Sequence, residues 1–355
     1  MSDEIIVARP PVDPGAFDEF GCRVYEASPS TPDRLTPTVR FHRQVADFSV
    51  TMADGKVLPF WGFKDPNESG GDRIWPSKII RVNQGSVVHC ELKPAKNTHT
   101  IHWHGIEPTP MNDGVGHTSF EVKSDYTYQW YASQAGTYFY HCHKNTVLHF
   151  EMGMYGMLIV DPPNGPGRLY AHRGADNLFP LEPRDLAYAA EAIWVYDDVD
   201  PRWHTLDHSA GICGEDVGLD RFEPKYFLCS GVPHNQTMTN AVTSIHVARN
   251  KNVLLRVLNA SYSTLKVTFP FRCYIAEADG RPLRWNPAQG DYSQPKVIEA
   301  GESIILTTAQ RRGIIVRGAD LTPSTSYTVR ADFLHWVTNQ PHSGGQVLTK
   351  VNVAR

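Results

Sequence analysis

The chain has 355 residues, of which 41% are hydrophobic and 20% charged, and its formal net charge is −4 at pH 7. This composition is typical of a globular protein, and the length predicts two domains of about 100 to 200 residues each. No apolar run of about 18 residues occurs, so we expect no membrane-spanning helix. The slight acidic excess argues against nucleic acid or anionic lipid as a partner.

Residues 1–40 are predicted to form an irregular N-terminal arm, because prolines and small polar residues dominate most of this stretch. The chain begins with acidic residues at positions 3 and 4 and lacks the apolar core of a secretory leader. The sequence therefore predicts a cytoplasmic protein. If a leader has been removed, the expected location becomes periplasmic or extracellular.

Short β-rich runs between turn signals predict a first β-sandwich over residues 41–163. The expected strands are residues 44–52, 78–82, 86–92, 127–131, 137–140 and 157–160. A cluster of prolines and glycines at 161–167 ends this unit and opens a linker, residues 164–188. A second strand-rich unit is expected over residues 189–355.

The six cysteines lie at positions 22, 90, 142, 213, 229 and 273, without a CxxC pair. This scattered arrangement requires no structural disulfide. We expect five of them to be small core residues and one, Cys142, to have a chemical role.

Two groups of histidines carry the first chemical signal. His99, His102 and His104 lie close together, and a second group, His141-Cys142-His143, contains a cysteine between two histidines. In a strand, residues two apart point to the same face. His102 and His104 should therefore share a face, and Cys142 should point away from its two neighbours.

These residues divide into two candidate copper sites. A cysteine thiolate, two histidines and a weak axial methionine form the ligand set of a blue, type 1 copper, and here that set is His99, Cys142, His149 and Met154. The four remaining imidazoles form a second face suited to further copper: His102, His104, His141 and His143. The backbone of Cys142 would join the two sites.

A purely structural role is the alternative for these histidines. One pair two residues apart is a weak signal, because strand histidines often face solvent or are satisfied in a core. Two such pairs, one of which flanks a cysteine and is followed by His149 and Met154, are hard to explain by chance. The ensemble favours copper binding.

Residues 97–105, 113–114 and 136–143 resemble the copper-binding domain of the multicopper oxidase family, which includes laccases and ascorbate oxidase. The resemblance covers most of residues 75–162, and residues 226–231, 254–260, 277–280 and 311–312 resemble the second domain more weakly. It implies an all-β fold of two tandem cupredoxin-like Greek-key β-sandwich domains.

The resemblance also implies a function. Such proteins are copper-dependent oxidoreductases, in which a type 1 copper accepts electrons from a small reducing substrate and passes them to a histidine-bound cluster that reduces dioxygen. By this likeness His102 would bind the type 2 copper, and the type 3 pair would be bound by His104, His141 and His143. The two-domain members resemble copper nitrite reductases in forming trimers with copper between subunits, so we expect a homotrimer.

The sequence departs from this family in two ways. A complete cluster takes histidines from two domains, but residues 189–355 contain no HxH motif. Seven histidines remain there or in the linker: His172, His204, His208, His234, His246, His335 and His342. Of these, His335 is the best candidate to reach a neighbour's copper. The second departure is the loop between His143 and His149, which is longer than in typical laccases.

These departures leave several functions open. The leading hypothesis is a laccase-like oxidase completed across a subunit interface. The alternatives are an enzyme like nitrite reductase with one type 2 copper, an electron-transfer or copper-binding protein with a degenerate second site, and an oxidase specialised for one organic substrate. An aspartate is usual in nitrite reductases at the position of His102, which disfavours nitrite.

Overall fold

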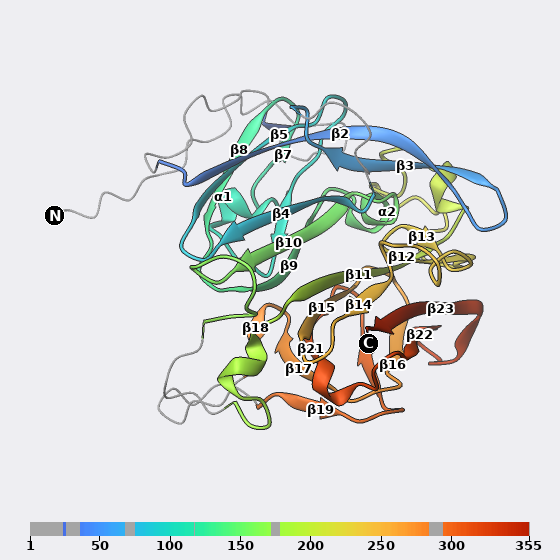
Figure 1. Cartoon of the computed structure of the whole chain (residues 1–355). Helices are drawn as coiled ribbons and strands as arrows, with labels where there is room; N and C mark the ends of the chain where they lie inside the picture. Colours follow the sequence, from blue (N-terminus) through green and yellow to red (C-terminus); the bar gives the residue numbers. More distant parts are fainter. Residues whose placement is uncertain are drawn as a thin grey trace.

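The computed structural model describes residues 24–25, 36–67, 75–116, 118–171, 178–283 and 294–354. Two β-sandwiches stand one above the other, the first nearer the N-terminus and the second nearer the C-terminus (Figure 1). Most of the predicted arm lies outside the described residues, as do Cys22 and His172. Within the described part, no helix is long and apolar enough to cross a membrane.

The first sandwich consists of two four-stranded sheets. One contains, in spatial order, β3 (Val57–Lys64), β2 (Val39–Thr51), β5 (Val87–Lys93) and β8 (Tyr126–Tyr131). The other contains β4 (Ser77–Asn83), β10 (Tyr155–Asp161), β9 (Gly136–His141) and β6 (His102–His104). Two short helices, α1 (Pro110–Asp113) and α2 (Thr146–Glu151), and a pair of two-residue strands, β1 (Val24–Tyr25) and β7 (Glu121–Val122), complete it.

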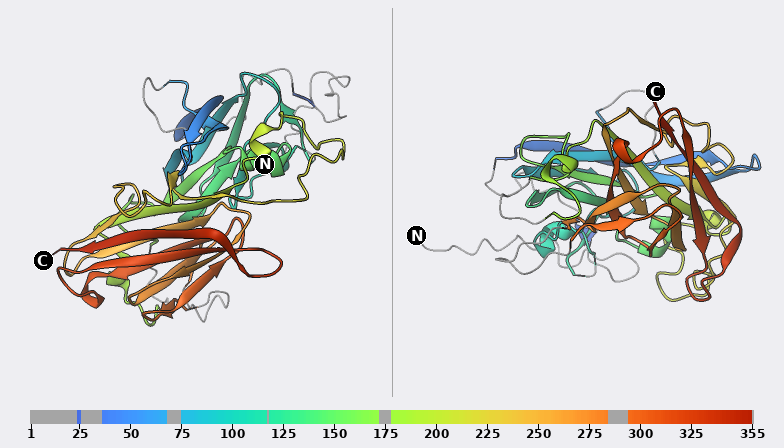
Figure 2. Two further views of the ribbon diagram at one scale, coloured as in Figure 1. Left: turned by 90° about the vertical axis from the view of Figure 1, so that its right-hand side faces the viewer. Right: turned by 60° about the horizontal axis from the view of Figure 1, so that its bottom comes forward.

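The second sandwich lies entirely after residue 189 and packs two sheets against each other (Figure 2). The larger sheet runs β13 (Val232–Pro233), β12 (Tyr226–Cys229), β11 (Ala190–Val199), β15 (Asn252–Asn259), β21 (Arg311–Arg317), β17 (Cys273–Ala278) and β18 (Arg281–Pro282), with β19 (Lys296–Ile298) also on β17. The smaller sheet runs β14 (Ile245–Val247), β23 (Pro341–Val353), β22 (Ser326–Leu334), β16 (Thr264–Thr268) and β20 (Ser303–Leu306). Three single-turn 3₁₀ helices occur at η1 (Pro183–Leu186), η2 (Trp203–Thr205) and η3 (Gly318–Asp320).

Strand β9 is buried on both faces, and its alternation positions the predicted copper ligands. Tyr138 and Tyr140 point into the core of the first sandwich, as does Cys142 just beyond the strand. Phe139 points the other way, into a cluster that includes residues of the second sandwich. Because side chains alternate along a strand, His141 lies on the Phe139 side, opposite to the cysteine.

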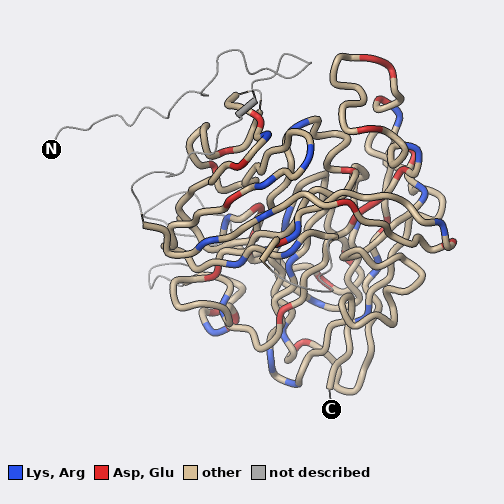
Figure 3. The backbone as a smooth tube through the Cα atoms, turned by 90° about the horizontal axis from the view of Figure 1, so that it is seen from above, with Lys and Arg blue, Asp and Glu red and all other residues tan. Residues whose placement is uncertain are grey.

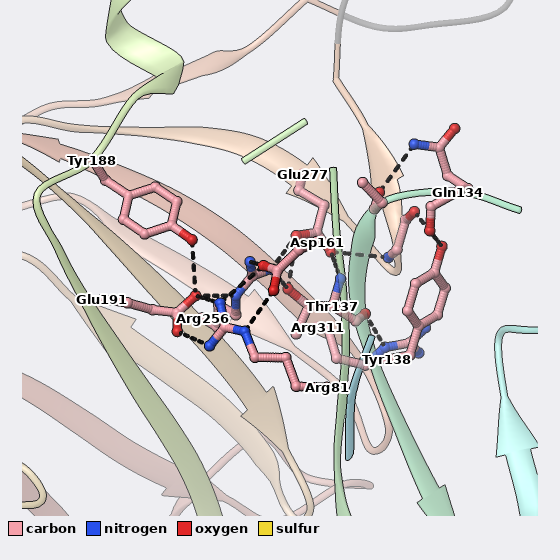
Figure 4. Close-up of polar contacts among 12 residues, drawn as sticks. Arg81, Gln134, Thr137, Tyr138, Asp161, Tyr188, Glu191, Arg256, Glu277 and Arg311 are labelled. Carbon is pink, nitrogen blue, oxygen red and sulfur yellow. Dashed lines mark hydrogen bonds and ion pairs between the residues drawn. The ribbon is translucent and has the colours of Figure 1, made fainter. Parts of the chain in front are cut away.

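A buried ion network joins the two sandwiches (Figure 4). Arg256 of β15 is fully buried; it pairs with Glu191 at 2.8 Å and donates a hydrogen bond to the Thr137 hydroxyl of β9 at 2.7 Å. Arg81 of β4 binds the same Glu191 at 2.6 Å. Glu277 of β17 accepts hydrogen bonds from the Thr137 amide and hydroxyl, both at 2.8 Å. Paired and hydrogen-bonded charges of this kind fix how the second sandwich sits against β9.

The prediction that five cysteines are core residues is wrong at one position. Cys90, Cys229 and Cys273 are buried, but Cys213 is exposed. It lies in a glycine-bordered turn, where its amide bonds to the carboxylate of Glu215 at 3.0 Å. Cysteine packs in cores as a small hydrophobe, but composition alone cannot show that a given residue lies in a turn.

Acidic and basic residues are interspersed along the backbone in the view of Figure 3. This distribution agrees with the small net charge of the whole chain.

Candidate metal centre

The predicted type 1 residues come together at one end of the first sandwich. The Cys142 Sγ atom lies 3.3 Å from Nδ1 of His149 and 3.6 Å from Nδ1 of His99. His149 belongs to α2, and His99 lies in the loop after β5, bridged to Val122 of β7. The backbone of Met154 is hydrogen-bonded to two of these residues: its amide donates to the His149 carbonyl at 3.1 Å, and its carbonyl accepts from the Cys142 amide at 3.0 Å.

The donor atoms of this group fit a copper ion. All four side chains are at most 2% exposed, and burial is the main cause that lowers the pKa of His99 well below its usual value and that of His149 to about 3. Both imidazoles are therefore neutral, the form that binds a metal. Burial raises the pKa of the Cys142 thiol to about 11, and a bound cation would deprotonate it. Thiolate, imidazole and thioether together are a soft set suited to copper.

The remaining four histidines gather on the opposite side of β9. In the β6–β9 pairing, His102 stands directly opposite His141, with ring centroids 5.1 Å apart. The rings of His104 and His143 lie 5.5 and 5.2 Å from that of His102. One donor atom from each of His102, His104 and His141 lies within 4.8 Å of the others, a grouping that can hold a metal ion.

Hydrogen bonds orient these rings. His102 donates from Nδ1 to the Asp113 carbonyl, and His141 donates from Nδ1 to the Cys142 carbonyl, each at 2.8 Å. Both residues therefore carry their lone pair on Nε2, the form that can bind a metal, and Nε2 of His141 lies 3.4 Å from Nδ1 of His104. Burial, followed by the nearby Arg311 charge, lowers the pKa of His104 to about 3. Its imidazole is neutral as well.

His143 lies at the edge of this face. Its amide binds the Thr100 hydroxyl at 2.8 Å, and its Nδ1 lies 3.2 Å from the Thr146 hydroxyl. It is half-buried and does not belong to the close group of three donors. The four predicted imidazoles thus form a compact three-histidine group with a fourth ring beside it.

A cavity of about 630 Å³ opens beside this face, and the second sandwich of the same chain forms its other wall. The described residues that the second sandwich contributes to this wall include Arg281, Arg311 and Asp279, and none of them is a histidine. His335 instead stacks on Trp336 at 4.3 Å and belongs to neither histidine group of the described chain. A role for His335 at a neighbouring subunit stays a prediction.

One site residue was not expected from the sequence. His208, between β11 and β12, forms a group with His99 and His149 whose donor atoms lie within 4.8 Å of one another. No spacing motif surrounds His208, and it is 59 residues from its nearest partner in the chain. Only the packing of this segment onto α2 reveals the contact.

A β-sandwich that brings a cysteine and two neutral histidines together, beside a second histidine cluster, defines a cupredoxin-like copper protein. Residues 70–165 match the family model of the multicopper oxidases. This match lies within the first sandwich and agrees with the resemblance that the sequence predicted.

The comparisons with individual proteins agree. An L-ascorbate oxidase of Cucumis sativus is 40% identical over 98 residues, which are 26% of this chain and 16% of that protein. Laccase-2 of Thanatephorus cucumeris is 26% identical over 254 residues, 67% of this chain and 39% of the laccase. The blue copper oxidase from Nitrosomonas europaea has the same fold, with a TM-score of 0.64 at 21% identity, over 88% of this chain and 85% of that one. This chain covers less than half the length of these two curated relatives.

Proposed function

We propose that the chain is a copper-dependent oxidoreductase that moves electrons from a small reducing substrate to dioxygen through two copper sites. Four residues would hold the type 1 copper: His99, Cys142, His149 and Met154. Four others would hold copper at the dioxygen site: His102, His104, His141 and His143. Bound copper supplies one-electron redox chemistry at the first site and dioxygen chemistry at the second.

The observation that carries this proposal is the position of Cys142 between the two groups. Its Sγ faces His99 and His149, while its carbonyl accepts the Nδ1 proton of His141 at 2.8 Å. One residue therefore contacts both groups, through its side chain and through its backbone. This gives a short path of bonds between electron entry and the reaction site.

The other residues of the site hold the imidazoles in place. Asp113 accepts the proton of His102, and the Phe139 ring stacks on His104 at 4.3 Å. The hydrogen bond fixes the tautomer of His102 and the stacking orients the His104 ring before any metal arrives, which strengthens metal binding. Arg311, which is almost fully buried, adds positive charge next to His104 and disfavours its protonation.

The first test is the copper content of the fully loaded chain, measured with dioxygen consumption. About four coppers per chain are expected if the second face holds a cluster. The double variant His102→Ala/His104→Ala should lose turnover and keep the blue absorption band. His246→Ala, an exposed residue on β14, is the matched control. Turnover at the wild-type rate in the double variant would refute the proposal.

A second candidate function is favoured by the grouping of donors. Among the described residues of this face, His102, His104 and His141 are the three whose donor atoms converge within 4.8 Å, which suits a single three-histidine copper rather than a cluster. The wall opposite carries Arg311 instead of further imidazoles. About two coppers per chain would favour this one-copper site, and about one would favour an electron-transfer protein.

The homotrimer is proposed on the same grounds. The histidine face opens to a cavity, and a neighbouring subunit could supply further ligands there, as a symmetric assembly allows. Light scattering on the copper-loaded protein tests this, with three times the chain mass of 39.8 kDa expected. A strict monomer would refute it.

A further inference from the structure

The segment between β11 and β12 leaves the second sandwich and packs on the first, beside the type 1 residues. Its Trp203, Ala210 and Phe222 form one buried apolar cluster with Leu148 and Met152, which lie in and just after α2. Asn145, the residue before α2, donates a hydrogen bond to the Ala210 carbonyl at 2.9 Å. Apolar and polar contacts together fix this segment against the helix that carries His149.

Within this segment, His208 contacts the centre through both its backbone and its side chain. Its carbonyl accepts the Nε2 proton of His149 at 3.0 Å, and its ring donates from Nε2 to the carbonyl of Thr98, also at 3.0 Å. Thr98 directly precedes His99. His208 therefore bridges the two predicted histidine ligands.

Ring packing reinforces this bridge. The His208 ring lies 4.5 Å from the ring of His149 and 4.9 Å from that of His99. Because Nε2 of His149 donates to the His208 carbonyl, the lone pair of this imidazole is on Nδ1, which faces Cys142. His149 is completely buried.

The solvent side of the centre lies at His208. A cavity of about 470 Å³ reaches this point and is lined by His99, His208, Trp61 and Asp207 among others. His208 is half-buried, whereas His99 is only 2% exposed. The cavity is thus bounded by His99 and the more exposed His208, whereas Cys142 and His149 are not among its lining residues.

We infer that His208 is a positioning residue for the type 1 copper: its ring anchors the segment to Thr98, its carbonyl orients His149, and its bulk keeps outside ligands from the metal. This inference rests on the proposed function, because it assumes copper at His99, Cys142 and His149. Groups that hold a metal ligand in orientation typically change metal affinity by about 10- to 100-fold when they are removed.

The test uses the full chain loaded with Cu(II), and it follows the blue absorption band and the copper hyperfine coupling in EPR, which report the cysteine-bound copper. His208→Ala removes the ring, His208→Leu keeps bulk without a donor, and His208→Gln keeps a donor for the Thr98 carbonyl. We expect the Ala and Leu variants to shift both signals and to lose copper about tenfold more readily to a chelator. In the Ala variant, titration with azide should also perturb the blue band.

The Gln variant and the control His246→Ala should behave like the wild type. If the His208→Ala variant does not fold, the inference is tested by comparing the blue band and copper retention of His208→Leu with those of His208→Gln. Wild-type signals and copper retention in both His208→Ala and His208→Leu would overturn the inference and leave the proposed function intact. A wild-type chain that binds copper without any blue band would instead overturn the proposed function, and the inference with it.

Discussion

Replacing Arg256 by methionine should weaken the attachment of the second sandwich to β9. Arg256 is fully buried and contacts Glu191 at 2.8 Å and the Thr137 hydroxyl at 2.7 Å. Removing one member of a buried ion pair costs about 3–5 kcal/mol, because the charge left behind stays buried. Here Arg81 still neutralises Glu191 at 2.6 Å. We therefore expect a loss near the lower end, about 3 kcal/mol in the free energy of unfolding.

Urea denaturation followed by circular dichroism and tryptophan fluorescence measures this loss, and coincident transitions show whether the two sandwiches unfold together. The control is Arg272→Met, which removes an exposed ion pair to Glu299 and should change stability little. If Arg256→Met lowers the unfolding free energy by less than about 1 kcal/mol, the network does not stabilise the interface as argued. Separate transitions in the wild type would also contradict the reasoning.

Three further predictions concern the metal centre and its surroundings. Met154→Leu should retain the blue band but change the reduction potential in a redox titration, because the axial ligand tunes it; an unchanged potential would exclude Met154 as a ligand. Burial raises the pKa of Asp198 to about 7, whereas the carboxyl of an unfolded chain titrates near pH 4. The free energy of unfolding should therefore be highest below about pH 4 and should fall by up to about 4 kcal/mol as the pH rises through 7. Urea midpoints should accordingly depend less on pH in Asp198→Asn, and an equal dependence would contradict this assignment. Gly114→Ala should destabilise the chain and weaken copper binding at the His102 face, since an added Cβ would clash with backbone at residue 101, whereas Gly55→Ala, also at positive φ but in open space, should cost much less.

Local sequence pattern was enough to group the predicted copper residues. The alternation along 102–104 and 141–143 needs only strand geometry, and the structure has the expected faces: Cys142 on the core side and His141 on the other. Not every strand could be recognised in the same way. β3 (Val57–Lys64) was not predicted, because its proline and glycine interrupt the alternation that marks a strand.

The contacts between distant segments were beyond the reach of the sequence. Nothing near Arg311 or Glu277 marks them as neighbours of β9, since both belong to the second sandwich. His208 carries no motif, and its closest contact to His149 uses a backbone carbonyl that every residue possesses. Among the seven later histidines, sequence position favoured His335, whereas packing brought His208 to the first copper group.

The sequence by itself determined the chemistry of the ligands and their division into two faces, because metal preference depends on residue type and strand direction alternates residue by residue. The tertiary structure alone decided what surrounds those faces. It placed Arg311 beside the histidine group and residue 208 over the type 1 group, since both arise from the packing of the second half of the chain onto the first. Such contacts depend on how buried surfaces fit together, which no short pattern encodes.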